Sequence, residues 1–149
     1  MKGIPRLLLA TCAIAFAMTL ALPQAANAEA GPDAIVGTWL TDGGESKVEI
    51  ERGGTQYSGK IVWLKEPERD GRPLRDANNT NAALRDRPLL GLEIVAGFSY
   101  ASNAVWTGGS VYSPRKGRSY PAELSLAPDG RLDIKVKDGI FSKHLYWSR

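Results

Sequence analysis

Apolar and polar residues alternate along most of the chain beyond residue 28, a spacing typical of β-strands with one buried face. The alternation is regular in residues 119–126, and Pro128-Asp129-Gly130 then predicts a tight turn. Because closing such a meander removes exposed sheet edges, we predict an all-β fold, a single eight-stranded antiparallel up-and-down barrel. The expected strands cover residues 36–41, 47–52, 56–64, 90–96, 104–112, 119–126, 131–137 and 140–147.

Two segments depart from this alternation within the expected barrel. Gly108-Gly109 falls inside one expected strand and indicates a bulge or a bend at a barrel corner. Residues 65–89 are rich in proline and in charges of both signs, and a connection of this length is typical of a lid or an ordered surface loop. We expect this loop to cover the barrel and to carry a short helical turn over residues 81–85. Asn79 or Thr80 would cap the turn, and its inward-facing residues would be Ala82, Ala83 and Leu84.

The N-terminal segment has the pattern of a signal peptide. A basic start is followed by an apolar run over residues 7–22, by Pro23, and by Ala26-Asn27-Ala28. We predict cleavage after Ala28, which leaves residues 29–149 as one β-barrel domain of a periplasmic or secreted protein. An uncleaved anchor is the weaker alternative, because a membrane span needs about 20 apolar residues. Acylation at Cys12 is also disfavoured, since Thr11 precedes it and little apolar sequence lies upstream.

Removal of this segment changes the charge of the chain. The net charge of +3 falls to +1 when Lys2 and Arg6 leave, so the bulk charge points neither to nucleic acid nor to an anionic membrane. No membrane span is expected after cleavage. The single cysteine leaves as well, so the domain must depend on its apolar core rather than on a disulfide.

An ordered set of short motifs runs from residue 37 to the end of the chain. The motifs are Gly37-Thr38-Trp39-Leu40, residues 59–64, residues 70–73, residues 85–92, residues 106–114 and Trp147-Ser148-Arg149. In this order they resemble DUF2147, a family of small exported bacterial proteins with a lipocalin-like fold. The resemblance implies a barrel and brings no catalytic residues. The family pattern often has a cysteine pair near the second hairpin, where this chain has Gly53 and Ser58, so no disulfide or redox role is expected there.

The resemblance also implies a contact between the two ends of the domain. In lipocalin-like barrels an arginine after the last strand covers the tryptophan of the first strand, which here pairs Arg149 with Trp39 as a cation–π contact. The alternative is an ordinary core tryptophan and a frayed terminal arginine. Both interpretations are structural.

Catalytic and metal-binding patterns are weak. Beyond the signal there is one histidine, His144, and no Gly-x-Ser-x-Gly elbow accompanies it. Zinc needs three or four ligands, and a calcium loop beginning at Asp76 would lack its glycine at Asn81 and its glutamate at Arg87. We therefore expect no enzyme activity, no metal and no cofactor.

Binding is the function that remains. Guanidinium groups suit carboxylates and phosphates, so Arg85 and Arg87, with Arg72 and Arg75, could form an anion site, although ion pairs within the loop are the stronger interpretation. We expect a small apolar or amphipathic ligand, held in the barrel or under the loop. The alternative is a non-enzymatic envelope protein that has a packed interior and acts through surface contacts. The aromatic candidates for lining a pocket, which could equally fill the core, are Trp63, Trp106, Tyr112, Tyr120 and Tyr146.

Overall fold

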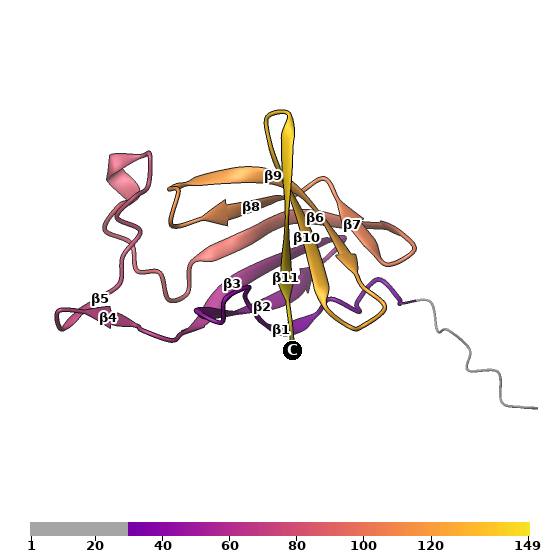
Figure 1. Ribbon diagram of the computed structural model, residues 1–149, viewed down its shortest axis with the longest axis horizontal. Coiled ribbons are helices and arrows are strands. Elements are labelled where there is room, and N and C mark those ends of the chain that lie inside the picture. The colour runs from indigo at the N-terminus through magenta and orange to yellow at the C-terminus, as the bar shows by residue number, and fades with distance from the viewer. Residues whose placement is uncertain (1–29) are drawn as a thin grey trace, which may run out of the picture.

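The computed structural model describes residues 30–149, and these residues form an all-β structure (Figure 1). The predicted signal peptide and its cleavage point after Ala28 lie outside the described residues. A separate hairpin of β4 (Glu68–Arg69) and β5 (Arg72–Pro73) and a 3₁₀ turn, η1 (Ala82–Leu84), belong to the long loop. The main sheet consists of β1 (Gly37–Leu40), β2 (Ser46–Gly53), β3 (Gln56–Leu64), β6 (Glu93–Ser102), β7 (Val105–Thr107), β8 (Ser110–Ser113), β9 (Arg118–Leu126), β10 (Leu132–Asp138) and β11 (Phe141–Trp147).

The main sheet is antiparallel throughout and curls until its two ends meet. Its strand order is β1-β2-β3-β6-β7-β9-β10-β11, with β8 between β6 and β9. Leu40 at the end of β1 and Ser148 after β11 form one antiparallel bridge with N···O distances of 2.6 and 3.0 Å. We call this bridge the seam. The prediction of an eight-stranded closed barrel needs correction, because the sheet has nine strands and its ends share a single bridge.

The extra strand arises at two glycines. Gly108 has φ of +82°, which ends β7, and the chain resumes as β8 at Ser110. A side chain at Gly109 would overlap the Phe98 ring of β6, so the close approach of these strands requires glycine. The expected strand over residues 104–112 is therefore bent into β7 and β8 at the position that the two glycines indicated.

The interior of the sheet is filled by apolar side chains, as the alternation of residues predicts. Its largest fully buried members include Trp39, Trp106, Tyr57 and Phe98. Trp106 contacts both Tyr57 and Tyr100 edge to face, with ring centroids 6.4 and 5.3 Å apart. The buried apolar residues other than Tyr120 form one continuous cluster, so the described chain has a single core.

Residues 30–36 close one end of this core. Ile35 is fully buried, and its carbonyl oxygen accepts a hydrogen bond from Trp39 Nε1 at 2.8 Å. The Arg149 guanidinium lies 4.5 Å from the centroid of the Trp39 ring and donates to the Ala34 and Val36 carbonyls. The expected contact between Trp39 and Arg149 is thus present, and it fastens the last residue to the closed end.

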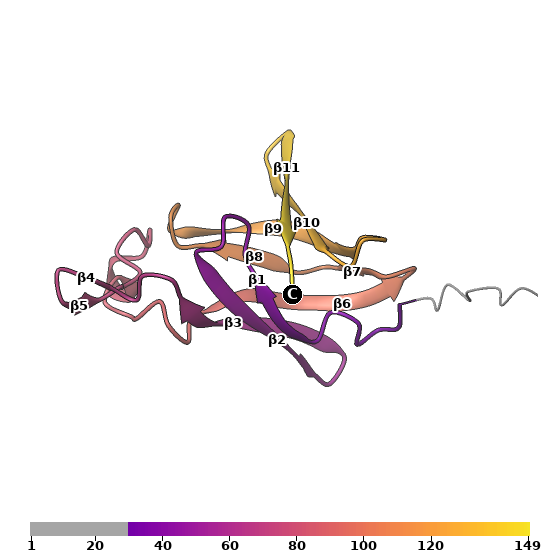
Figure 2. The ribbon, with the colours of Figure 1, turned by 60° about the horizontal axis from the view of Figure 1, so that its bottom comes forward.

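Two parts of the chain project from the curled sheet in both ribbon views (Figures 1 and 2). The long loop with β4 and β5 extends from the end opposite residues 30–36. The β10–β11 hairpin rises from another side, and its pairing with β9 stops at Val136. Within residues 30–149, no helix is long and apolar enough to cross a membrane.

Candidate functional site

A cleft of about 930 Å³ lies at the end of the sheet opposite residues 30–36, under the long loop. It forms where β2 and β6 begin and β3 ends, so the loop that connects β3 to β6 covers it. Sites for small molecules are typically about 300–1,000 Å³ with mostly apolar walls and a few polar groups. The apolar residues that line this cleft are Ile61, Leu64, Leu74, Leu89 and Ile94.

Charged side chains surround this apolar lining. The basic ones are Arg69, Arg72, Arg75 and Arg115, and the acidic ones are Glu45, Glu66, Asp70 and Asp86. Among the described residues, none of these four arginines is within salt-bridge distance of a carboxylate. Their guanidinium groups therefore retain donors for an anionic group of a ligand.

Two of these arginines face each other across the β4–β5 hairpin. Arg69 and Arg72 are direct cross-strand partners, joined by Asp70-Gly71 with φ of +54° and +71°. Positive φ at both central residues is typical of a tight hairpin turn. Like charges placed directly opposite each other destabilise a strand pair, so an anion bound between them would relieve this repulsion.

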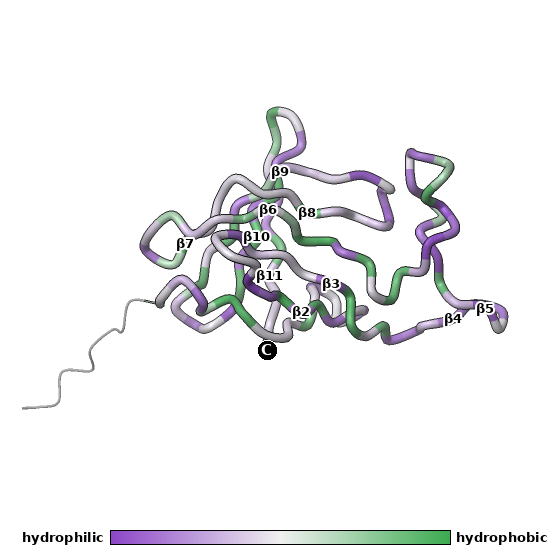
Figure 3. Tube along the Cα trace, turned by 180° about the vertical axis from the view of Figure 1, so that it is seen from behind, coloured by the Kyte–Doolittle hydropathy of each residue, from purple (hydrophilic) through white to green (hydrophobic). Residues whose placement is uncertain are grey.

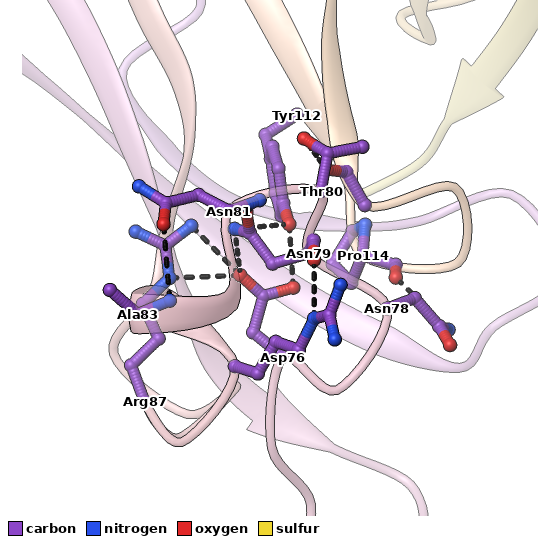
Figure 4. Close-up of polar contacts among 11 residues, drawn as sticks. Asp76, Asn78, Asn79, Thr80, Asn81, Ala83, Arg87, Tyr112 and Pro114 are labelled. Atoms are coloured by element: carbon purple, nitrogen blue, oxygen red, sulfur yellow. Dashed lines mark hydrogen bonds and ion pairs between the residues drawn. The ribbon is translucent and has the colours of Figure 1, made fainter.

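A buried polar cluster holds the loop in place (Figure 4). Asp76 is fully buried and accepts hydrogen bonds from the Tyr112 hydroxyl at 2.6 Å and from Asn79 Nδ2 at 2.8 Å. Arg87 binds the same carboxylate through Nε at 2.9 Å and Nη2 at 2.8 Å, and its guanidinium lies over the Tyr112 ring. We call Asp76, Asn79, Arg87 and Tyr112 the Asp76 cluster. It ties both ends of the loop segment 76–87 to β8.

The cluster shifts the pKa of its members. Burial alone raises the pKa of Asp76, but hydrogen bonds from Asn79, Tyr112 and Arg87 outweigh burial and hold this pKa below its usual value. Burial and the hydrogen bond to Asp76 raise the pKa of Tyr112. Both shifts favour an ionised Asp76 and a neutral Tyr112 at neutral pH, the states in which their hydrogen bond is satisfied.

Backbone contacts add to this anchor. Thr80 N donates to the Gly117 carbonyl at 3.0 Å, in the turn between β8 and β9. Gly117 has φ of +67°, and a side chain there would overlap the carbonyl group of Asn78. Arg85 Nε donates to the Asn79 carbonyl at 2.8 Å. The loop is therefore an ordered cover of the cleft.

The helical turn of the loop is present but differs in two details from the prediction. Asn81 caps it, because its side chain accepts from Ala83 N at 3.1 Å, whereas Asn79 belongs to the Asp76 cluster. Ala82, Ala83 and Leu84 are exposed instead of facing inward. The Asp76 cluster occupies the inner side of the loop, so the apolar residues of the turn lie outside.

The seven predicted site residues do not form one site, and only Arg87 and Tyr112 are in contact with each other. Trp63 is 41% exposed on the outer face, with Lys47 Nζ 5.6 Å from its ring centroid. Alternation from Tyr57 would place Trp63 inside, but a register shift between Lys47 and Val48 inserts Val62 as an extra residue and turns Trp63 outward.

The other predicted residues are spread over five environments, and only Arg87 and Tyr112 share one. Trp106 is fully buried in the core. Tyr120 is buried beside Arg118 Nε, while Tyr146 is 41% exposed beneath Arg131. Tyr112 and Arg87 belong to the Asp76 cluster, and Arg85 binds loop backbone. None of the seven predicted residues lines the cleft.

His144 lies on the outer face of β11, where its Nδ1 is 2.8 Å from Asp133 Oδ1. Its ring stacks on Tyr146, and both His144 and Asp133 reach solvent. In residues 30–149 no group of three or more histidine, cysteine or acidic side chains is placed to hold a metal ion. The arrangement of the cleft is suited to binding through apolar contacts and charge.

The residues that line the cleft were missed as a set from the sequence. Arg72 and Arg75 were considered as anion ligands, but Ile61, Leu64 and Ile94 were not considered for a site. The available signal was the apolar Leu89 at the end of a highly charged loop, which indicated that the loop lies against the sheet.

Comparisons with known proteins agree with this fold. The chain is similar to a solved structure described as HP1028 from Helicobacter pylori, a protein of the lipocalin family. The two share 20% identity and a TM-score of 0.64, over 76% of this chain and 81% of the other. No curated protein matches the sequence significantly. A family model described as "Uncharacterized protein conserved in bacteria (DUF2147)" matches residues 37–149. The chain therefore belongs to the DUF2147 family and has a lipocalin-like fold.

Proposed function

We propose that this protein is exported and binds a small amphipathic molecule in the cleft under residues 65–89. The observation that carries the proposal is the combination of an apolar lining with four arginines that have no carboxylate partner among the described residues. The alkyl part of a ligand would contact Leu64, Leu74 and Leu89, which are half-buried in the lining. Its head would reach the charged surround.

An anionic head fits this surround best. Arg69 and Arg72 face each other and neither forms an ion pair within the described residues, and guanidinium groups bind carboxylates and phosphates through paired hydrogen bonds. The cleft also contains four carboxylates, so its net charge is balanced. A preference for anionic ligands would therefore come from the position of the ligand's head beside the β4–β5 hairpin rather than from the net charge of the cleft.

The filled interior supports a site at the end of the sheet rather than inside it. Trp106 and Phe98 occupy the centre and are fully buried. The same observation favours the alternative function, a non-enzymatic envelope protein that acts through surface contacts. The two functions are distinguished by testing whether a substitution in the cleft abolishes ligand binding.

Calorimetric titration with a medium-chain fatty acid, the alcohol of equal length and the corresponding alkylammonium ion tests the proposal. Ala77→Trp fills the cleft from an exposed position in its lining, and Ala101→Trp places the same ring at an exposed position outside it. We expect the fatty acid to bind wild type and Ala101→Trp but not Ala77→Trp. Equal binding by all three proteins, or no binding of any probe, would refute the proposal.

A second variant tests the anionic head. Arg69→Gln combined with Arg72→Gln should weaken fatty-acid binding by roughly tenfold and leave binding of the alcohol unchanged. Native mass spectrometry of the protein recovered from its own cells would then identify the molecule that it carries.

A further inference from the structure

The tip of the β10–β11 hairpin exposes two large apolar side chains. Ile140 is 94% exposed and Phe141 is 74% exposed, the two highest values among the large apolar residues of the described chain. Ile140 lies in the turn of Gly139 and Ile140 that joins the strands, and Phe141 begins β11 as the cross-strand partner of Asp138. Gly139 has φ of +62°, which fits a tight two-residue turn and fixes Ile140 at its apex. Such turns normally carry polar residues, so this apex is exceptional.

The hairpin holds this tip away from the rest of the protein. The pairing of β10 with β9 ends at Val136, and beyond that residue β10 pairs only with β11. The ribbon views show the hairpin standing clear of the curled sheet, and the hydropathy trace shows an apolar segment at its apex (Figure 3). The tip is therefore convex and reachable from several sides.

Positive charge lies just below the tip. Lys137 and Lys143 are exposed, on opposite faces of the hairpin, at roughly two residues or about 7 Å of strand from the apolar pair. Neither lysine forms an ion pair within residues 30–149. The acidic groups on the hairpin are already engaged, since Asp138 lies 3.5 Å from Arg118 and Asp133 contacts His144.

Lys135 adds less to this positive surface. It is half-buried and directly opposite Glu123 of β9 in the sheet. Lys137 and Lys143 therefore supply most of the positive charge that a binding partner of the tip would contact.

We propose that the β10–β11 tip docks the protein on an anionic lipid surface. Ile140 and Phe141 would enter the boundary between headgroups and acyl chains, which lies about 5–10 Å deep for such interfacial anchors. Lys137 and Lys143 would then lie at the level of the phosphates, with their alkyl stems along the hairpin. The bulk charge of the chain gave no reason to expect a membrane partner, and the proposal depends on the local arrangement alone.

The geometry favours lipid over a second copy of the chain. In a symmetric dimer through this tip, the same patch of both copies would meet, and the lysines of one copy would face those of the other. Like charges in such proximity are destabilising, whereas anionic headgroups complement them.

Vesicle binding tests the proposal, with vesicles of phosphatidylcholine alone or mixed with phosphatidylglycerol. Ile140→Ser combined with Phe141→Ser should lower binding to the mixed vesicles by at least about tenfold. Lys137→Gln combined with Lys143→Gln should lower it by roughly 25-fold, about fivefold for each lysine near the surface. The matched control, Leu84→Ser with Leu90→Ser, removes two exposed apolar side chains from elsewhere and should bind as wild type does.

A local probe makes the result independent of any other membrane contact, including one made by the apolar N-terminal segment. Phe141→Trp should gain fluorescence quenching by brominated acyl chains beyond that of wild type, and Leu90→Trp should not. Quenching confined to Phe141→Trp supports the proposal. Absence of that quenching, or equal binding by wild type and the tip variant, overturns it. Light scattering that shows a dimer dependent on Phe141, without lipid binding, overturns it in favour of a second copy.

The proposal is independent of the function assigned to the cleft. Ala77→Trp should bind vesicles as wild type does, so a failure of ligand binding and a failure of membrane docking remain distinguishable.

Discussion

Replacement of Asp76 by alanine should release the loop from the sheet, because Asp76 is the acceptor on which the Asp76 cluster depends. The substitution removes the acceptor for Asn79 Nδ2, for the Tyr112 hydroxyl and for both Arg87 nitrogens that contact it. Loss of one member of a buried ion pair costs about 3–5 kcal/mol. Since the Arg87 side chain is 35% exposed and can regain water, we expect the lower end, about 3 kcal/mol.

This loss should appear as local opening of residues 65–89. The loop contains several arginines, so trypsin should cleave it faster when it detaches from the sheet. When opening and closing are fast, cleavage follows the population of the open form, and about 3 kcal/mol corresponds to a rate increase of roughly 100-fold. Limited proteolysis with mass analysis of the fragments measures this rate, and urea unfolding measures the global free energy.

Asp86→Ala is the matched control. Asp86 lies in the same loop, is exposed, and has no ion pair within the described residues. Its replacement should change stability by less than about 0.5 kcal/mol. If Asp76→Ala and Asp86→Ala were cleaved at the same rate, the assignment of Asp76 as the anchor of the loop would be wrong.

Three further predictions concern stability. Because the pKa of Asp76 is lowered in the folded state, its ionised carboxylate stabilises the fold above about pH 4, and this stabilisation is lost as the pH falls through the folded-state pKa. Urea unfolding at pH 2–6 should therefore show a fall in the free energy of unfolding that Asp76→Asn lacks. Trp39→Ala should lower the free energy of unfolding by about 4 kcal/mol, because the Trp39 side chain is fully buried. Trp63→Ala should lower it by less than about 1 kcal/mol, and similar melting temperatures of the two variants would contradict the packing of β1. Gly117→Ala should destabilise more than Gly130→Ala, since both have positive φ but only Gly117 lies against the loop backbone; equal unfolding midpoints would count against the close contact.

The sequence predicted most strands well because their alternation is local information, although the strand expected over residues 90–96 lies at residues 93–102 as β6. The expected strands at residues 56–64 and 119–126 match β3 and β9 to within a residue, and the two glycines indicated the bend between β7 and β8. The orientation of Trp63 could not be predicted from local alternation. Its outward orientation depends on the register between β2 and β3, and a register is a property of two strands together.

The cleft was harder to predict for a related reason. Ile61 and Ile94 have the spacing of core residues and are buried in the core, and only the tertiary arrangement of β3 and β6 under the loop places them against the cleft. Asp76 likewise resembles the other acidic residues of the loop in the sequence. Its burial follows from the position of Tyr112, which is distant in the chain, so only the tertiary structure distinguishes it.

The seam between Leu40 and Ser148 bears on the order in which the protein folds. Most other strand pairings join strands that are close in the chain, and the longest connection among them, between β3 and β6, spans residues 65–92, so these pairings cost less loop entropy than the seam does. The seam joins opposite ends of the described residues through two backbone hydrogen bonds. It should therefore form after the rate-limiting step, and weakening it should accelerate unfolding while folding keeps its rate. Although Leu40 and Ser148 form only two backbone hydrogen bonds with each other, these bonds should have a large effect on the unfolding rate of the protein.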